Sequence, residues 1–278
     1  DSYQYDKLLI ATGSRPRILT IPGSDLSGIH YLRTIDDVDG IREAMQAAKK
    51  ICIVGGGYIG LEVAAVAVTA GLQVTVLEME DRILQRVTTP EMSEYYHDLH
   101  TGRGVNIMVN TGVSGFQGEG HISTVVCGDE KIDADLVIVG IGIIPNIELA
   151  EAAGLDCNNG ITVDEHCRTS DPHIYAAGDC TNHPNPIMGR RLRLESVPNA
   201  MEQARVSAAN MLGGDKAYAS VPWFWSDQYE LKLQMVGFST DGDTSILRGD
   251  KAANKFAVFY LKDGEVVSVD AVNSPKEF

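Results

Sequence analysis

The sequence predicts an α/β fold in which strands, turns and helices alternate, with a small α+β unit at the C-terminal end. The first observation is an apolar run at residues 51–54, which enters a glycine-rich turn and then a helical pattern at residues 61–66. The second is the apolar run at residues 136–139, of the kind that is buried in a parallel sheet. The third is the alternation of residues 256–261 and 266–271 around an Asp-Gly turn, which predicts a β-hairpin.

The composition is that of an ordinary globular chain of 278 residues, long enough for two domains. Hydrophobic residues make up 44% of it, yet no apolar stretch approaches the roughly 20 residues that span a bilayer. The formal net charge of −15 argues against binding to nucleic acid or to an anionic membrane. Because the first residues also lack the basic and apolar segments of a signal peptide, we expect a soluble, cytoplasmic protein.

The cysteines and histidines show no metal-binding or redox pattern. No two of the five cysteines form C-x-x-C. The cysteine spacing typical of zinc sites and a redox-active pair of neighbouring cysteines are therefore both absent. We therefore expect reduced, partly buried thiols. The seven histidines lack an H-E-x-x-H pattern and are interpreted as surface or packing residues, so no metal site is predicted. The cysteines are Cys52, Cys127, Cys157, Cys167 and Cys180.

The N-terminal part is predicted to form a strand, a crossover and a helix. Residues 7–10 form an apolar strand that runs into the glycine turn at residues 11–13, and nothing precedes this strand to pair with it. Residues 14–28, with prolines and glycines, are expected to be a loop that crosses between domains. Residues 36–50 place apolar side chains at helical spacing and end in two lysines, as the C-terminus of a helix prefers.

The turn that follows has the pattern Gly55-x-Gly57-x-x-Gly60, between a strand and a helix. In a dinucleotide-binding turn, the first glycine permits the turn, the second lets the backbone approach a pyrophosphate, and the third lets helix pack on strand. The pyrophosphate then lies on free N–H groups at the positive end of the helix dipole. Taken alone, the same pattern is also compatible with a glycine-rich structural turn.

The next strand, at residues 74–77, ends in Glu78. This is close to the spacing of roughly 20 residues at which an acid binds the ribose 2′-hydroxyl of a dinucleotide. The charge of Glu78 would repel a 2′-phosphate, which favours NADH over NADPH. Arg82 follows four residues later and could in principle accept that phosphate. The strand, the helix and the acid together predict a dinucleotide site with a preference for NADH.

Short strands and helices are expected through the rest of the chain. The run at residues 136–139 ends in Gly140-Ile141-Gly142, a turn that leaves room for a ligand. After Gly213-Gly214 the pattern changes to a β-rich unit that ends with the hairpin. Further strands are expected at residues 105–109, 113–116 and 121–127, and further helices from Pro90 to Gly102, at 148–153 and at 200–211 with Asn199 as N-cap.

Three segments together carry a resemblance to the two-dinucleotide-binding flavoprotein reductases: residues 11–13, the turn at residues 55–60, and the segment at residues 174–179. The chain is most similar to the NADH-dependent ferredoxin reductases of the putidaredoxin reductase type, over essentially its whole length. The most specific marks of this likeness are residues 31–34, 195–204 and 222–229.

The resemblance implies two Rossmann-like dinucleotide-binding domains, of which the FAD one is incomplete, and a small C-terminal α+β domain. The partial FAD-binding domain would comprise residues 1–17 and 141–213, the NAD-binding domain residues 18–140, and the truncated C-terminal interface domain residues 214–278. Such reductases usually open with their own GxGxxG turn for FAD, which is missing here. We therefore expect a fragment, trimmed at both ends.

The resemblance also implies the residues that contact FAD. Asp179 would bind the ribityl chain, although an aspartate here could simply cap a turn. Val197 would present its backbone to the pyrimidine edge of the flavin, just before a helix N-terminus that favours the negative charge of the reduced ring. Arg33 would contact FAD, with a surface ion pair as the alternative. The implied FAD residues are Thr12, Gly13, Arg15, Arg33, Gly178, Asp179, Glu195, Val197 and Trp225.

The NAD residues implied in the same way surround the glycine turn. Glu62 would lie near the nicotinamide carboxamide, or would merely complement the helix dipole. Ile59 would pack beside the nicotinamide, or in the core. No catalytic side chain is expected, because hydride passes directly from C4 of NADH to the flavin N5 and the protein only orients the rings. The implied NAD residues are Gly55, Gly56, Gly57, Tyr58, Ile59, Gly60, Glu62, Glu78, Arg82, Gly140, Ile141 and Gly142.

The implied activity is electron transfer from NADH through FAD to a [2Fe-2S] ferredoxin that serves an oxygenase. A basic run, Arg190, Arg191 and Arg193, could steer this acidic partner, or could be a solvated loop. The absence of C-x-x-C excludes a thioredoxin reductase, whereas a glutathione-type disulfide reductase is excluded only in part. An NADH oxidase, a monodehydroascorbate-type reductase and a slow NADH-binding flavoprotein of the apoptosis-inducing factor type remain open. A fragment without the first FAD turn could also bind NADH and catalyse nothing.

Overall fold

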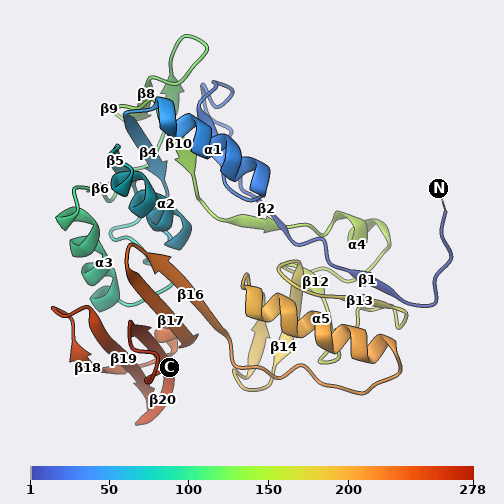
Figure 1. The fold of residues 1–278 in the computed structure, drawn as a ribbon. Helices are drawn as coiled ribbons and strands as arrows, with labels where there is room; N and C mark the ends of the chain where they lie inside the picture. The colour runs from blue at the N-terminus through green and yellow to red at the C-terminus, as the bar shows by residue number, and fades with distance from the viewer. Residues whose placement is uncertain (1) are drawn as a thin grey trace. The chain divides into compact units, whose positions relative to one another are not determined.

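The computed structural model describes residues 2–278, and the chain divides into two compact units. The first unit combines the chain up to Arg15 with Ile143–Phe224, and the second combines Pro16–Gly142 with Trp225–Phe278. Figure 1 shows the elements of both units, which are described separately below. The domain boundaries expected from the sequence stay a prediction.

The second unit contains a five-stranded parallel sheet with the strand order β3-β10-β4-β5-β6. Its central strand β4 leads through helix α2 to its neighbour β5, as in a Rossmann-like unit, so the predicted α/β class is confirmed. The strands are β3 (Ile29–Tyr31), β4 (Lys50–Val54), β5 (Gln73–Leu77), β6 (Asn106–Met108) and β10 (Leu136–Val139), and the helices are α1 (Ile35–Ala47), α2 (Tyr58–Thr69) and α3 (Pro90–Gly102).

Both faces of this sheet are buried, as is typical of a parallel sheet. On one face, Ile53 and Val76 pack with Ile41 of α1 and Ala64 of α2. On the other face, residues such as Cys52 pack against a small antiparallel sheet. That small sheet consists of β7 (Gly115–Gln117), β8 (Thr124–Cys127) and β9 (Glu130–Asp133). Strand β9 was not predicted, because its residues are mostly exposed and show no apolar alternation.

The C-terminal part of the chain forms an antiparallel sheet with the order β16-β17-β20-β19-β18. The predicted hairpin is confirmed as β19 and β20, with Asp263 and Gly264 at positive φ in the turn. The three preceding strands were not predicted individually. The elements are β16 (Trp223–Gln228), β17 (Leu231–Gly237), η1 (Ser239–Asp241), β18 (Thr244–Asp250), β19 (Lys255–Lys262) and β20 (Glu265–Val272).

The first unit is built from small sheets beside one long helix, α5. Strand β1 (Leu8–Ile10) pairs in parallel with β13 (Ile174–Ala176), and Ile10 and Ile174 share a core with Ile161. The strand at the start of the chain therefore finds its partner among later residues. The other elements are β2 (Ser14–Pro16), β11 (Ile143–Pro145), α4 (Glu148–Ala152), β12 (Ile161–Thr162), β14 (Thr181–Asn185), β15 (Arg190–Leu192) and α5 (Val197–Met211).

Three local expectations were wrong. Helix α1 ends at Ala47 rather than Lys50, and Lys50 opens β4 instead. The cause is Asp135, whose carboxylate accepts the backbone N–H groups of both Lys49 and Lys50 and draws this segment beside β10. The expected loop at residues 14–28 contains strand β2, which pairs with β11.

The third error concerns the start of α5, where Asn199 was expected to be the N-cap. The helix begins at Val197, and the N-cap is Ser196, whose hydroxyl accepts the backbone N–H of Asn199. Pro198 lies in the first turn, a position that proline favours because its missing N–H would have no partner there. With the serine cap and this proline, the helix begins three residues earlier than the apolar pattern indicated.

None of the helices within residues 2–278 combines the length and the apolar character needed to cross a membrane. All five cysteines are free thiols, and four of them are buried.

Candidate functional site

The three glycines of the turn between β4 and α2 have different roles. A Cβ atom on Gly55, which has φ +112°, would lie 2.3 Å from the carbonyl oxygen of Gly140. A Cβ on Gly60 would lie 2.1 Å from the carbonyl oxygen of Gly55. Around Gly57, in contrast, no atom lies within 4 Å of such a Cβ. The first and third glycines are therefore required by packing, and the second leaves an open approach to the backbone.

The same Gly57 is the N-cap of α2, a helix of 12 residues. Glycine has no side chain to accept a hydrogen bond, and no side-chain cap is made at this end. The first N–H groups of a helix have no intrahelical partners and carry the positive end of its dipole. An open, uncapped helix N-terminus of this kind fits the pyrophosphate of a dinucleotide.

The carboxylate of Glu78 lies at the edge of this turn. Its Oε2 accepts the backbone N–H of Gly56 at 2.8 Å, and its Oε1 accepts that of Glu80 at 3.0 Å. The acid predicted to bind a ribose hydroxyl is thus brought next to the glycine turn. This arrangement follows from the register of β4 and β5, which ends both strands at the same edge of the sheet.

The guanidinium of Arg82 is used within the protein and does not point to a site for a 2′-phosphate. Its Nη2 donates hydrogen bonds to the carbonyl oxygens of Gln85 and Thr88, at 3.1 and 3.0 Å. Through these hydrogen bonds the guanidinium stabilises the loop after β5. Sequence reasoning had considered this arginine as a possible acceptor of a 2′-phosphate, and the loop contacts give it an alternative role.

The remaining predicted NAD residues surround the turn. Gly140 donates its N–H to the carbonyl oxygen of Val54, which joins the ends of β10 and β4. Gly142 has φ +101° with open space around it, and Ile59 is half exposed. The hydroxyl of Tyr58 instead donates to Sδ of Met235 in β17, so this side chain points toward the C-terminal sheet.

Glu62 lies one turn into α2, and its carboxylate accepts the hydroxyl of Ser226 at 2.6 Å. Burial raises the pKa of Glu62, while the hydrogen bonds from Ser226 and from the backbone of Asp227 lower it. Ser226 was noted in the sequence only as part of a family mark, with no role. It became visible as a partner of Glu62 only in the fold.

The first unit brings two of the predicted FAD segments together. Because β1 and β13 pair in parallel, the turns at residues 11–13 and 177–179 leave the sheet at the same edge. Ser14 Oγ donates to Oδ2 of Asp179 at 2.7 Å across these turns. A Cβ added to Gly178, which has φ +85°, would meet only the Cβ of Ala200, at 3.6 Å. Such an edge, at the carboxyl ends of parallel strands, is where doubly wound folds bind ligands.

Asn146 was missed by sequence reasoning, although it organises two of the predicted residues. It accepts the hydroxyl of Thr12 on its carbonyl oxygen at 2.6 Å and donates its side-chain amide to the carbonyl of Thr12 at 2.8 Å. Its Oδ1 accepts Nη1 of Arg15 at 2.6 Å. Arg15 also forms an exposed ion pair with Glu148 at 2.7 Å. No local signal marks an asparagine whose partners are more than a hundred positions away.

Helix α5 supplies the rest of the first unit's candidate site. Val197, in its first turn, is 56% exposed, and Glu195 before it pairs with Arg193. Buried Gln203, another residue without a predicted role, accepts the N–H of Gly178 at 2.8 Å. The other two predicted FAD residues, Arg33 and Trp225, are exposed residues of the second unit.

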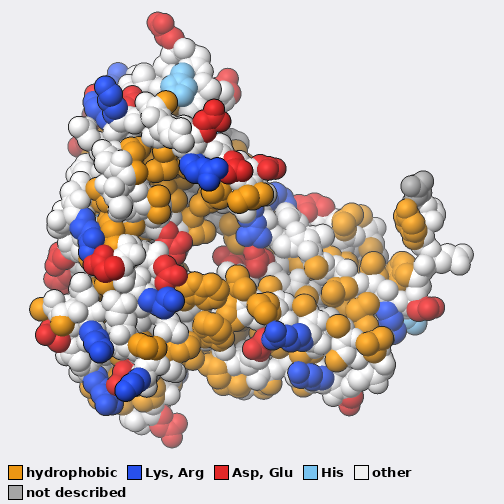
Figure 2. Space-filling model, viewed as in Figure 1, with side chains coloured by type: hydrophobic (Ala, Val, Ile, Leu, Met, Phe, Trp, Pro, Cys, Tyr) orange, Lys and Arg blue, Asp and Glu red, His pale blue; other side chains and the backbone are white. Residues whose placement is uncertain are grey.

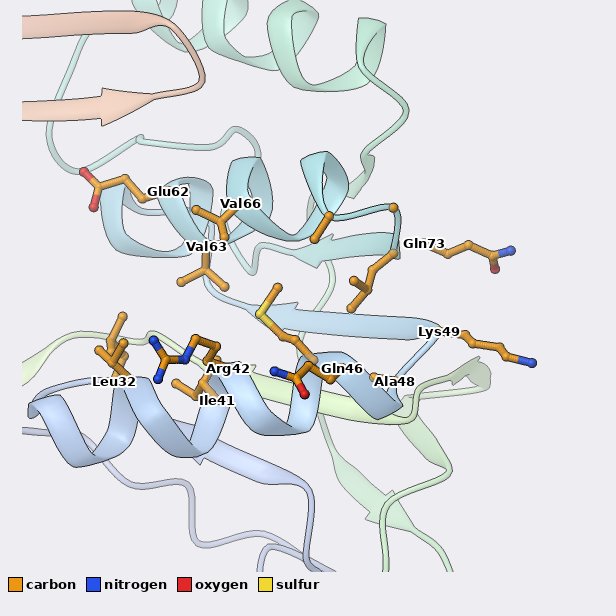
Figure 3. Close-up of a pocket in the computed structure, with 15 residues that line it drawn as sticks. Leu32, Ile41, Arg42, Gln46, Ala48, Lys49, Glu62, Val63, Val66 and Gln73 are labelled. Atoms are coloured by element: carbon orange, nitrogen blue, oxygen red, sulfur yellow. The ribbon is translucent and has the colours of Figure 1, made fainter.

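The second unit also carries a groove of about 900 Å³ between α1 and α2. Figure 2 shows hydrophobic side chains gathered over these helices, and Figure 3 shows Val63 pointing toward α1 across the groove. Glu62, at one end, points away from it (Figure 3). Glu62 is also the one predicted NAD or FAD residue among the groove's lining residues. The groove is therefore distinct from the glycine turn.

Within the described part of the chain, no three His, Cys, Asp or Glu side chains are grouped so that they could hold a metal ion.

Comparison with known proteins identifies similarity along nearly the whole chain. Residues 1–204 match the family model described as pyridine nucleotide-disulphide oxidoreductase, and residues 223–278 match the model described as reductase C-terminal. The chain is 47% identical to putidaredoxin reductase CamA of Pseudomonas putida, over 99% of this chain and 67% of that protein.

Two solved structures have closely similar folds. One is the ferredoxin reductase for the CYP199A2 system from Rhodopseudomonas palustris, with a TM-score of 0.96 and 42% identity over 99% of this chain and 68% of that one. The other is the covalent putidaredoxin reductase–putidaredoxin complex, with a TM-score of 0.94 and 47% identity over 99% of this chain and 67% of that one. The chain thus spans about two thirds of the length of these relatives.

Proposed function

The chain belongs to the pyridine nucleotide-disulphide oxidoreductase family, and on this premise we propose that it passes electrons from NADH through FAD to a [2Fe-2S] ferredoxin. The observation that carries the proposal is the glycine turn, where an open Gly57 and an uncapped helix adjoin the carboxylate of Glu78. The solved relatives include a ferredoxin reductase and a reductase in complex with putidaredoxin, which supports a small iron–sulfur protein as the partner. We place the protein in the cytoplasm.

The chain's own residues would bind and orient the two nucleotides. The N-terminus of α2 would neutralise the pyrophosphate of NADH, and Glu78 would accept the ribose hydroxyl and repel a 2′-phosphate. Asp179 and the turn at residues 11–13 would hold FAD at the edge formed by β1 and β13. When bound there, FAD would supply a group able to take two electrons from NADH and to release them singly. The protein's contribution is positioning, for which no acid or base is needed.

Docking of the ferredoxin near Arg190, Arg191 and Arg193 is a finer part of the proposal. Arg190 and Arg191 belong to the exposed strand β15, and a local cluster of cations in a chain of net charge −15 favours an acidic partner. Arg191 donates to the carbonyl oxygen of Val163 at 2.8 Å, and Arg193 pairs with Glu195. Arg190→Glu is therefore the informative change, because it leaves both of these contacts in place.

The experiment has two parts. Fluorescence titration of the chain should give a dissociation constant for NADH at least tenfold lower than for NADPH. Rapid mixing of the FAD-loaded protein with NADH should bleach the flavin, and added [2Fe-2S] ferredoxin should then be reduced, more slowly at low salt in Arg190→Glu. Rapid NADH oxidation by oxygen, unaffected by any iron–sulfur protein, would instead indicate an NADH oxidase.

A further inference from the structure

A continuous row of hydrogen bonds connects Glu62 with the surface of the second unit. Ser226 Oγ lies 2.6 Å from Glu62 Oε1, and Gln228 Nε2 lies 3.1 Å from Ser226 Oγ. Gln228 Oε1 lies 2.8 Å from Nε2 of His100, and Nδ1 of His100 lies 2.9 Å from the hydroxyl of Tyr229. Four hydrogen bonds therefore link five side chains, which we call the Glu62 relay.

The interior members of the relay come from two elements and are shielded from water. Ser226 and Gln228 alternate with the exposed Asp227 along β16, so both point to the buried side of the sheet. His100 reaches them from the last turn of α3. The exposed fractions of Ser226, Gln228 and His100 are 1%, 0% and 0%. A polar group buried this deeply must be hydrogen-bonded to avoid a large desolvation cost.

The donors and acceptors allow one consistent direction through the relay. An ionised Glu62 can only accept, so Ser226 donates to it and must accept from the amide of Gln228. The carbonyl of Gln228 then faces His100, which requires a proton on Nε2. Nδ1 of a neutral His100 is left to accept the hydroxyl of Tyr229. Aligned hydrogen bonds of this kind polarise and strengthen one another.

The surroundings of His100 favour the neutral ring that this direction requires. Burial is the main cause that lowers the pKa of His100, and the charges of His97 on α3 and of Arg103, the C-cap of this helix, lower it further. The guanidinium of Arg103 lies over the ring of Tyr229 in the facing turn, with Cζ 4.3 Å from the ring centroid. Glu230 of the same turn forms an ion pair with Arg103. The hydrogen bond to Gln228 acts in the opposite direction but is the smaller effect.

We propose that Ser226, Gln228 and His100 are positioning residues that orient the Glu62 carboxylate toward the nicotinamide end of bound NADH. This inference rests on the proposed function, in which NADH binds at the glycine turn, and on the expectation from the family resemblance that Glu62 lies near the nicotinamide. It assigns a role to alternate residues of the segment at 222–229, which the sequence marked as specific but could not explain. A carboxylate on a flexible side chain loses entropy when it must be ordered by the ligand, and the relay orders it beforehand.

A double-mutant cycle on NADH binding tests the relay, with the full chain titrated by NADH fluorescence. Ser226→Ala and Glu62→Gln should each raise the dissociation constant about tenfold, the size expected for one hydrogen bond to a charged group. If Ser226 acts through Glu62, the double variant should also be weakened about tenfold, not a hundredfold. Ser268→Ala is the matched control and should bind NADH as the unmodified chain does. Ser268 is a buried serine of the C-terminal sheet whose hydroxyl has no partner among residues 2–278.

A second measurement reports on the relay without any ligand. The ¹⁵N shifts of His100 should show the neutral Nε2–H tautomer near pH 7, and Gln228→Met should abolish this preference. Gln228→Met also replaces Ser226→Ala in the binding cycle if the alanine variant does not fold.

The outcomes separate the two proposals. An unmodified chain that does not bind NADH overturns the proposed function. An unmodified chain that binds NADH, with Glu62→Gln weakened but Ser226→Ala unchanged or fully additive, overturns the relay and leaves the proposed function intact.

Discussion

Two helices of this protein begin where a nucleotide is proposed to bind, and they begin differently. Helix α2 starts after Gly57, with no side-chain cap and open space at the N-cap position. Helix α5 starts after Ser196, whose hydroxyl accepts the N–H of Asn199 and so closes the first turn. The first helix leaves its N–H groups for a ligand, whereas the second satisfies one of them itself.

The difference indicates two uses of a helix N-terminus. An uncapped end can bind a charged pyrophosphate directly, at the cost of a less stable helix start when no ligand is present. A capped end keeps its dipole but offers fewer N–H donors. Such an end would suit the flavin ring expected beside α5, which gains negative charge only when it is reduced. In the proposed site the start of α2 would therefore be used for binding, whereas the start of α5 is closed by its own cap.

The largest effect is expected from Gly60, the glycine that packs α2 onto the turn. In Gly60→Ala the new Cβ would collide with the carbonyl oxygen of Gly55, so the free energy of unfolding should fall by about 3 kcal/mol. Gly40→Ala in α1 is the control, because nothing lies within 4 Å of its Cβ, and it should stabilise the protein by about 1 kcal/mol. Urea denaturation measures both. Equal midpoints for the two variants would contradict the packing role of Gly60.

Gly57→Ser would make the start of α2 resemble that of α5. Its side chain has room, so the free energy of unfolding should change by less than about 0.5 kcal/mol. The hydroxyl would cap the helix and occupy the approach to its N–H groups, so the dissociation constant of NADH should rise about tenfold or more. Calorimetric titration measures the affinity. Unchanged NADH binding in a folded variant would show that the N-terminus of α2 is not the pyrophosphate site.

The C-terminal sheet behind α2 should make stability depend on pH through Asp270. This buried carboxylate accepts hydrogen bonds from Thr88 and Tyr260, both at 3.0 Å, and burial raises its pKa to about 6. Since this value exceeds the ordinary 3.8, the folded state binds the proton more tightly. The resulting stabilisation is absent well above pH 6, appears as the pH falls through about 6, and is complete below 3.8.

Between about pH 7.5 and about pH 5 the unmodified chain should gain about 1.4 kcal/mol from this group, and Asp270→Asn should lack that gain. Urea denaturation at both pH values measures it. Parallel pH profiles for the two proteins would mean that Asp270 keeps an ordinary pKa.

The smallest effect is expected at the start of α5. Ser196→Ala removes the side chain that caps this helix, which should reduce the free energy of unfolding by about 1 kcal/mol. NADH affinity should stay unchanged, because Ser196 caps α5 and is not among the residues proposed to bind NADH. Thermal unfolding and NADH titration are measured together. A loss of NADH affinity larger than twofold would show that the cap of α5 also affects NADH binding.

The elements that sequence reasoning predicted well are those with local causes. The glycine turn, helix α3 from Pro90 to Gly102 and the hairpin of β19 and β20 depend on residues close together in the chain. The wrong end of α1, in contrast, arose where a distant group intervened. Asp135 ends α1 early by binding the backbone of Lys49 and Lys50, which no pattern within residues 36–50 could reveal.

By itself, the sequence determined the α/β class, the position of the glycine turn and the acid that follows it, because these depend on backbone sterics and side-chain periodicity. Only the tertiary structure decided which side chains meet. Glu62 and Ser226 are separated by 164 positions, and His100 and Gln228 by 128. Hydrogen bonds across such distances are specified by sheet register and helix packing, which are properties of the folded chain as a whole.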